Sequence, residues 1–177
     1  MAEAMVQSSN SVYAKVADKV GAEKLYRMAR NFGFGMKTSE NLAGEEAGRL
    51  YMPYGLTRDD RTLKTMGFGH AVSVTPIQMV MAYAAIANGG TLMEPMIVKE
   101  WRDSDGNLVE KKDPVKVRRV ISERTAASIR KMLNRVVNSG TAKRVASKKI
   151  PDVIFGGKTG TAEKYNQEIG KYDREHQ

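Results

Sequence analysis

Cysteine is absent from this 177-residue sequence, and histidine occurs only as His70 and His176. Without cysteine, the chain has neither disulfide bonds nor cysteine-ligated zinc. The two histidines lie far apart and do not have the spacing of metal ligands. We therefore expect no cofactor.

Long apolar runs are also missing. No stretch reaches the eighteen or so apolar residues of a transmembrane helix, and the first residues lack the basic and apolar regions of a signal peptide. The composition, 41% hydrophobic and 28% charged, is that of one ordinary globular domain with a core of its own.

Positive charge is in excess, with 29 lysines and arginines against 20 acidic residues. Basic residues gather at 111–112, 116–119 and 143–149, but aromatic residues are not interleaved with them and no nucleic-acid-binding motif occurs. A solvated basic face is therefore expected, without a nucleic-acid partner. A basic helical module for nucleic acid is a remote alternative, and the salt dependence of duplex DNA binding would test it.

The stretch 153–164 is the most informative part of the chain. A short apolar run at 153–155 predicts a buried strand, and the residues GGKTGT follow it. Glycines allow a ligand to approach closely, while Lys158, Thr159 and Thr161 offer a positive charge and hydrogen-bond donors for an anion. A glycine-weakened edge strand is the alternative. A phosphate-binding loop is excluded, because Asp152 stands where its first glycine belongs.

Helices are predicted elsewhere by periodicity and capping. Residues 5–31 suggest two helices joined near Gly21. Thr75, Pro76 and Gln78 form the signature of a helix start, and Asn88 marks its end. A further helix begins near residue 122 and ends near 140. For the helix between Thr75 and Asn88, the residues expected on the buried side are Ile77, Val80, Met81, Ala84 and Ala85.

The other segments carry weaker signals. Residues 33–69 predict a long connection of the kind that borders a working site. Residues 96–101 and 108–110 flank a turn and predict a β-hairpin. The polar tail 165–177 is expected to be poorly ordered.

Three segments occur together in a fixed order: Ser8-Ser9-Asn10, residues 69–78 with 87–90, and residues 157–162. This arrangement resembles the transpeptidase domain of class B penicillin-binding proteins, the serine enzymes that cross-link bacterial peptidoglycan. The resemblance covers nearly the whole chain. It implies an α+β, β-lactamase-like fold that is mostly helical, with a hairpin and a K-T-G strand. Residues 1–177 would form one partial domain, with a mainly helical part at 1–91 and the remainder at 92–177.

One part of the family pattern is missing. The family's nucleophile lies in an S-x-x-K motif that precedes S-x-N by some tens of residues, whereas only seven residues precede Ser8 here. Ser128 and Lys131 match S-x-x-K formally, but they follow S-x-N, so we do not assign them a catalytic role. We expect an inner piece of the domain, inactive alone. An unpaired K-T-G strand would invite strand exchange into a homo-oligomer.

The resemblance also implies roles for the residues that match. Ser8 would relay a proton and Lys158 would balance charge, while Asn10 would bind the substrate's side amide. Thr159 would bind the terminal carboxylate and Gly160 would leave room for the substrate. The residue that would supply half of an oxyanion hole is Thr161.

The implied partners are peptidoglycan stem peptides ending in D-Ala-D-Ala, and β-lactam antibiotics that mimic this end. The implied location is the extracytoplasmic side of the bacterial cytoplasmic membrane. A related serine β-lactamase or β-lactam sensor domain is the alternative, because both share K-T-G and S-x-N. The segment 74–78 with 88–90 favours the cross-linking enzymes.

Overall fold

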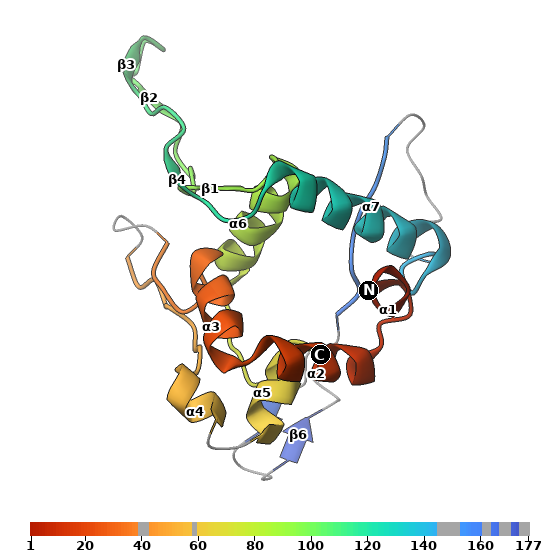
Figure 1. The fold of residues 1–177 in the computed structure, drawn as a ribbon. Helices are drawn as coiled ribbons and strands as arrows, with labels where there is room; N and C mark the ends of the chain where they lie inside the picture. Colours follow the sequence, from red (N-terminus) through yellow and green to blue (C-terminus); the bar gives the residue numbers. More distant parts are fainter. Residues whose placement is uncertain (39–42, 58–59, 145–152, 161–163, 167–170, 174–177) are drawn as a thin grey trace. The chain divides into compact units, whose positions relative to one another are not determined.

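Helices form most of the regular structure in the computed structural model, which describes residues 1–38, 43–57, 60–144, 153–160, 164–166 and 171–173 (Figure 1). The chain divides into two compact units. The larger contains residues 9–131, and the smaller combines residues 1–8 with 132–177. The expected division of one partial domain near residue 91 stays a prediction. None of the helices in the described part is long and apolar enough to span a membrane.

Four helices of the larger unit pack against one another, and two of them supply residues to a buried core. Helices α2 (Asn10–Val20) and α3 (Ala22–Asn31) meet at Gly21, as predicted, and Gly21 has a φ of 82° that suits glycine. Helices α4 (Pro53–Thr57) and α5 (Asp60–Met66) lie in the segment that we expected to be a long connection, so that expectation was wrong. The buried centre of this core consists of Ala22, Leu63 and Met66.

Helix α6 (Pro76–Ala87) begins with the predicted capping box. The Thr75 side chain accepts from the Gln78 amide at 3.3 Å, and the Gln78 side chain accepts from the Thr75 amide at 2.9 Å. The expected buried face is partly wrong, because Val80 is 67% exposed and Ala84 is exposed as well. Gln78 is buried instead, and its polar side chain can be buried because its Nε2 donates to the carbonyls of Met36 and Ala47. A second core forms around Met81, Ala85 and Leu92.

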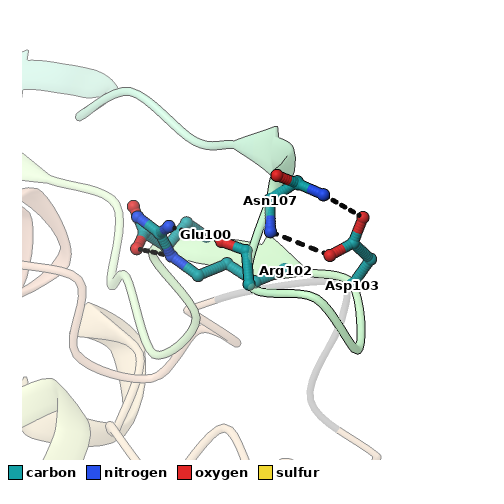
Figure 2. A network of polar contacts seen from close by, with 5 residues as sticks. Glu100, Arg102, Asp103 and Asn107 are labelled. Atoms are coloured by element: carbon teal, nitrogen blue, oxygen red, sulfur yellow. Dashed lines mark hydrogen bonds and ion pairs between the residues drawn. The ribbon is translucent and has the colours of Figure 1, made fainter.

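A two-stranded arm follows α6 (Figure 1). Strand β1 (Thr91–Met93) pairs with β4 (Lys116–Arg119), and β2 (Glu100–Arg102) pairs with β3 (Leu108–Lys111), both antiparallel. The predicted hairpin is therefore confirmed. Its turn is closed by Asp103, whose carboxylate accepts from the Asn107 amide at 2.8 Å and from the Asn107 side chain at 3.1 Å (Figure 2). These bonds, led by that of the Asn107 side chain, lower the pKa of Asp103.

Helix α7 (Glu123–Ser139) was predicted by its periodic apolar residues, and its residues from 132 onward belong to the smaller unit. There Val136, Val137 and Ala142 form a buried cluster with Val6 of helix α1 (Ala2–Val6). The apolar periodicity of the N-terminal segment did not predict that α1 is a short helix distinct from α2.

The predicted strand at 153–155 is absent. Residues 153–160 form no strand, and Val153 and Ile154 are 50% and 87% exposed. The physical reason is that a strand needs a paired backbone, whereas this segment directs its hydrogen bonds to α7. Strand exchange through this segment stays a prediction without structural support.

The expectation of a poorly ordered tail is wrong for residues 165–166 and 171–173, while residues 167–170 and 174–177 lie outside the described residues. Strand β5 (Lys164–Asn166) pairs antiparallel with β6 (Lys171–Asp173). The tyrosines of the two strands, Tyr165 and Tyr172, are register partners. Polar composition therefore did not prevent a strand pair, because the backbone supplies the pairing in a ladder.

Candidate active site

Ser8 occupies the turn between helices α1 and α2. It is half-buried, and its φ of 55° lies in the left-handed region that residues other than glycine rarely adopt. Its amide donates to the Met5 carbonyl at 3.3 Å. Backbone strain of this kind persists where the surroundings impose it, and it clusters at functional sites. The N-cap of α2 is Ser9, whereas Ser8 directly follows Gln7, the C-cap of α1, where a helix commonly ends in the left-handed conformation.

Lys158 reaches Ser8 across 150 positions of sequence. Its Nζ donates a short hydrogen bond to Ser8 Oγ, and it also donates to the Thr159 carbonyl at 2.8 Å. Both residues belong to the smaller unit. Burial lowers the pKa of the Lys158 ammonium. Within the described residues no carboxylate forms an ion pair with it.

Helix α7 fixes the segment that carries Lys158. The Phe155 carbonyl accepts from Asn134 Nδ2 at 2.6 Å, and the Gly157 amide donates to the Leu133 carbonyl at 3.2 Å. The approach is close enough that a Cβ on Gly156 would come within 3.2 Å of Leu133 Cβ. Gly156 therefore allows the backbone of this segment to pack closely against the helix.

A second hydroxyl lies beside Thr159. Thr141 follows the end of α7, and its Oγ1 is 2.8 Å from Thr159 Oγ1. Lys158 Nζ is 3.5 Å from the same Thr159 oxygen. Sequence reasoning missed Thr141, because nothing in the local pattern around it indicates which distant segment it contacts.

Of the other predicted site residues, the structure gives a position for Asn10 and for Gly160. Asn10 is the first residue of α2, in the larger unit, and is exposed. Gly160 is exposed, with no atom within 4 Å of the position that a Cβ would take. Thr161 lies outside the described residues. The formal S-x-x-K serine, Ser128, donates its hydroxyl to the Arg124 carbonyl of its own helix at 3.0 Å.

The chemistry available at Lys158 follows from its surroundings. A partly desolvated amine with a lowered pKa can exchange a proton with a neighbouring hydroxyl, here that of Ser8. Two threonine hydroxyls and an ammonium together can bind an oxyanion. Within the described ranges there is no group of three or more metal-ligating side chains. The cluster is therefore suited to proton transfer and carboxylate binding.

Comparison with protein families gives one match over the whole chain. The model for the penicillin binding protein transpeptidase domain matches residues 1–177. The chain is 40% identical over 171 residues to stage V sporulation protein D from Bacillus subtilis, covering 96% of this chain and 25% of that protein. It is 35% identical over 173 residues to penicillin-binding protein PbpB from Mycobacterium tuberculosis, covering 94% and 25%. The chain thus spans about a quarter of the length of these curated relatives.

Solved structures show the same kinship. The chain matches penicillin binding protein 3 from Mycobacterium tuberculosis, complexed with aztreonam, with a TM-score of 0.84, 32% identity, and coverage of 98% of this chain and 39% of that one. It matches the D,D-transpeptidase domain of a peptidoglycan glycosyltransferase from Eggerthella lenta with a TM-score of 0.80, 30% identity, and coverage of 93% and 42%. These matches confirm the predicted transpeptidase-type α+β fold. The chain belongs to the penicillin-binding protein transpeptidase domain family.

Proposed function

We propose that this chain is part of a bacterial peptidoglycan D,D-transpeptidase, which cross-links stem peptides through an acyl-serine intermediate and is acylated by β-lactams. The observation that supports this most directly is the hydrogen bond from Lys158 Nζ to Ser8 Oγ. It unites the first serine of S-x-N with the lysine of K-T-G. Relatives named peptidoglycan D,D-transpeptidases and a relative solved with aztreonam agree with the proposal.

Ser8 and Lys158 carry the proton transfer in this proposal. The nucleophilic serine oxygen attacks the penultimate D-Ala carbonyl, so that a C–O bond forms and the peptide C–N bond breaks. The serine proton passes through Ser8 Oγ to the departing D-Ala nitrogen. Lys158 holds the Ser8 hydroxyl in place, and its lowered pKa suits it to balance charge during the transfer.

The remaining residues bind the substrate. Thr159 donates to the terminal carboxylate, close to the Lys158 charge. Gly160 leaves the substrate room, and Asn10 bonds its side amide. The amide of Thr161 supplies one oxyanion donor, and the loss of such a donor typically costs about 100-fold or more in rate.

The nucleophile in this proposal lies outside these 177 residues. Ser128 is the first residue of the chain's S-x-x-K match, and its hydroxyl is occupied by its own helix. The chain alone is therefore inactive. The complete protein would act on the extracytoplasmic side of the cytoplasmic membrane, where its peptidoglycan substrate is found.

Fluorescent penicillin labelling tests these assignments. We expect the full-length protein that carries this chain to give a covalently labelled band on a denaturing gel, and the 177-residue chain to give none. Ser8→Ala and Lys158→Ala should each slow labelling by about 10²–10⁴-fold, because each removes a proton-transfer group.

Ser128→Ala is the matched control and should label at the unaltered rate. Failure of the full-length protein to label would contradict the proposed function. A labelled band from the 177-residue chain would contradict the external nucleophile, and slow labelling of Ser128→Ala would point to Ser128 instead.

A further inference from the structure

We infer that Thr141 is a positioning residue for carboxylate binding: it orients the Thr159 hydroxyl and connects that residue to the turn that carries Ser8. This inference rests on the proposed function. It is carried by two contacts of one residue. Thr141 Oγ1 lies 2.8 Å from Thr159 Oγ1, and the Thr141 amide donates to the Val6 carbonyl at 3.3 Å. Val6 ends α1, two residues before Ser8.

The turn after α7 holds Thr141 firmly. The amides of Gly140 and Ala142 both donate to the Val136 carbonyl, at 3.0 and 3.3 Å. Val136 is fully buried, and Ala142 is only 8% exposed. A Cβ on Gly140 would lie 2.6 Å from the Val6 carbonyl oxygen, so this turn approaches α1 as closely as glycine allows. Thr141 therefore has little freedom to adjust its position.

The role of Thr141 follows from the number of hydrogen bonds that the Thr159 hydroxyl can donate. Thr159 has one hydroxyl proton, which it can donate either to Thr141 or to a bound carboxylate. If Thr159 donates its hydrogen bond to the carboxylate, the lone pairs of Thr159 Oγ1 remain free to accept a hydrogen bond from the Thr141 hydroxyl. This direction polarises the Thr159 hydroxyl and strengthens its bond to the ligand. Without the Thr141 hydroxyl, Thr159 keeps its proton but loses the partner that orients it.

The effect should appear in carboxylate recognition and leave bond formation at the nucleophile unchanged. The test measures acylation of the full-length protein by benzylpenicillin and by its methyl ester, which lacks the carboxylate charge. In Thr141→Val, we expect the apparent binding constant for the acid to weaken about 5–10-fold, as for the loss of one hydrogen bond. The acylation rate at saturation and the constants for the ester should stay within about twofold of those of the unmodified protein.

Thr141→Ser is the matched control, because it retains the hydroxyl, and it should keep the preference for the acid. A double-mutant cycle with Thr159→Val adds a second measurement. If the two hydroxyls act as a pair, their combined loss should cost less than the sum of the single losses. Thr141→Ala replaces Thr141→Val in the cycle if the valine variant is poorly folded.

The outcomes separate the inference from the function on which it rests. An unmodified protein that is acylated with a preference for the acid, together with a Thr141→Val variant that loses this preference, supports the inference. A Thr141→Val variant that keeps the preference overturns the inference alone. An equal loss for acid and ester also overturns it, because it indicates a merely structural role. An unmodified protein that neither compound acylates overturns the proposed function and the inference together.

Discussion

Lys158 combines charge, burial and a hydroxyl partner in one side chain. Desolvation disfavours its ammonium form and lowers its pKa, while its donor bonds to Ser8 Oγ and the Thr159 carbonyl keep the side chain in one position. The same residue can thus be a stable donor in the resting protein and a proton-transfer partner during reaction. A lysine at the surface would offer the charge without the proximity or the altered pKa.

We expect Lys158 to titrate below the ordinary lysine pKa of 10.5. The unfolded chain then binds more protons than the folded chain between the lowered pKa and 10.5, so this residue makes stability rise with pH across that window. Lys158→Met should remove the rise. Urea unfolding across the window, together with NMR of isotopically labelled lysine side chains, measures both effects. A Lys158 signal that titrates at or above 10.5 would contradict the expectation.

The site residues were only partly predictable from the sequence. Ser8 and Lys158 stand in short motifs whose order along the chain carries information, and the structure brings them together. Thr141 has no comparable signal, because its partner Thr159 is eighteen positions away and the contact depends on how the intervening segment packs. The left-handed conformation of Ser8 was not visible either, since serine is an ordinary helix cap.

Helix α6 gives the clearest example of an element that the sequence specifies. Thr75, Pro76 and Gln78 set its start by local chemistry alone, and all three play the expected parts. Gln78 also does what no local rule indicates. Its side chain is 1% exposed, and its Nε2 donates to the carbonyls of Met36 at 2.7 Å and Ala47 at 2.9 Å. The helix start thereby organises a connection some 30–40 residues earlier in the chain.

Gln78→Met tests this dual role. The substitution preserves length and shape but leaves the Met36 and Ala47 carbonyls without their donor, and each buried unsatisfied group costs about 1–3 kcal/mol. We expect a loss of about 2–4 kcal/mol in unfolding free energy. The comparison is Thr75→Ala, which removes only the cap and should cost about 1 kcal/mol. Equal losses in the two variants, measured by urea unfolding, would argue that Gln78 acts only as a cap.

Other elements show where periodicity fails. Residues 153–155 are as apolar as a buried strand, yet the chain uses Phe155 to pack against the α7 cluster and leaves Ile154 exposed. An apolar run states that a segment prefers burial, but not what will cover it. Helices α4 and α5 show the opposite error, because the sequence pattern did not predict two helices that do form. Their glycine and charged residues obscure a helical pattern that packing against α2 and α3 stabilises.

At the scale of the whole molecule, family membership establishes the kind of domain, whereas the activity of the complete protein is a separate question. The match over residues 1–177 establishes the kind of domain, while the chain's span of about a quarter of its curated relatives leaves the complete activity to experiment. The net charge of +9 is a property of the whole chain. It affects the response of the protein to pH, as do tyrosines far from Lys158 in sequence.

Tyr13 and Tyr83 should govern part of the alkaline response. Burial raises the pKa of both phenols above 10.0, so above that pH the folded chain holds more protons than the unfolded chain. Stability that is fully present below pH 10 is therefore lost as the pH rises further. Because phenylalanine does not ionise, Tyr13→Phe and Tyr83→Phe should each reduce this loss, as measured by urea midpoints at pH 9 and pH 11 with unchanged slopes.

Tyr54→Phe provides the matched control, because it removes a phenol from a residue that is 74% exposed. Its alkaline loss should equal that of the unmodified protein. If all three variants changed the loss equally, the cause would be the removal of any phenolate charge and not the burial of two particular rings. If none did, the alkaline loss would arise from deprotonation of the chain's many lysines, whose attraction to carboxylates then disappears.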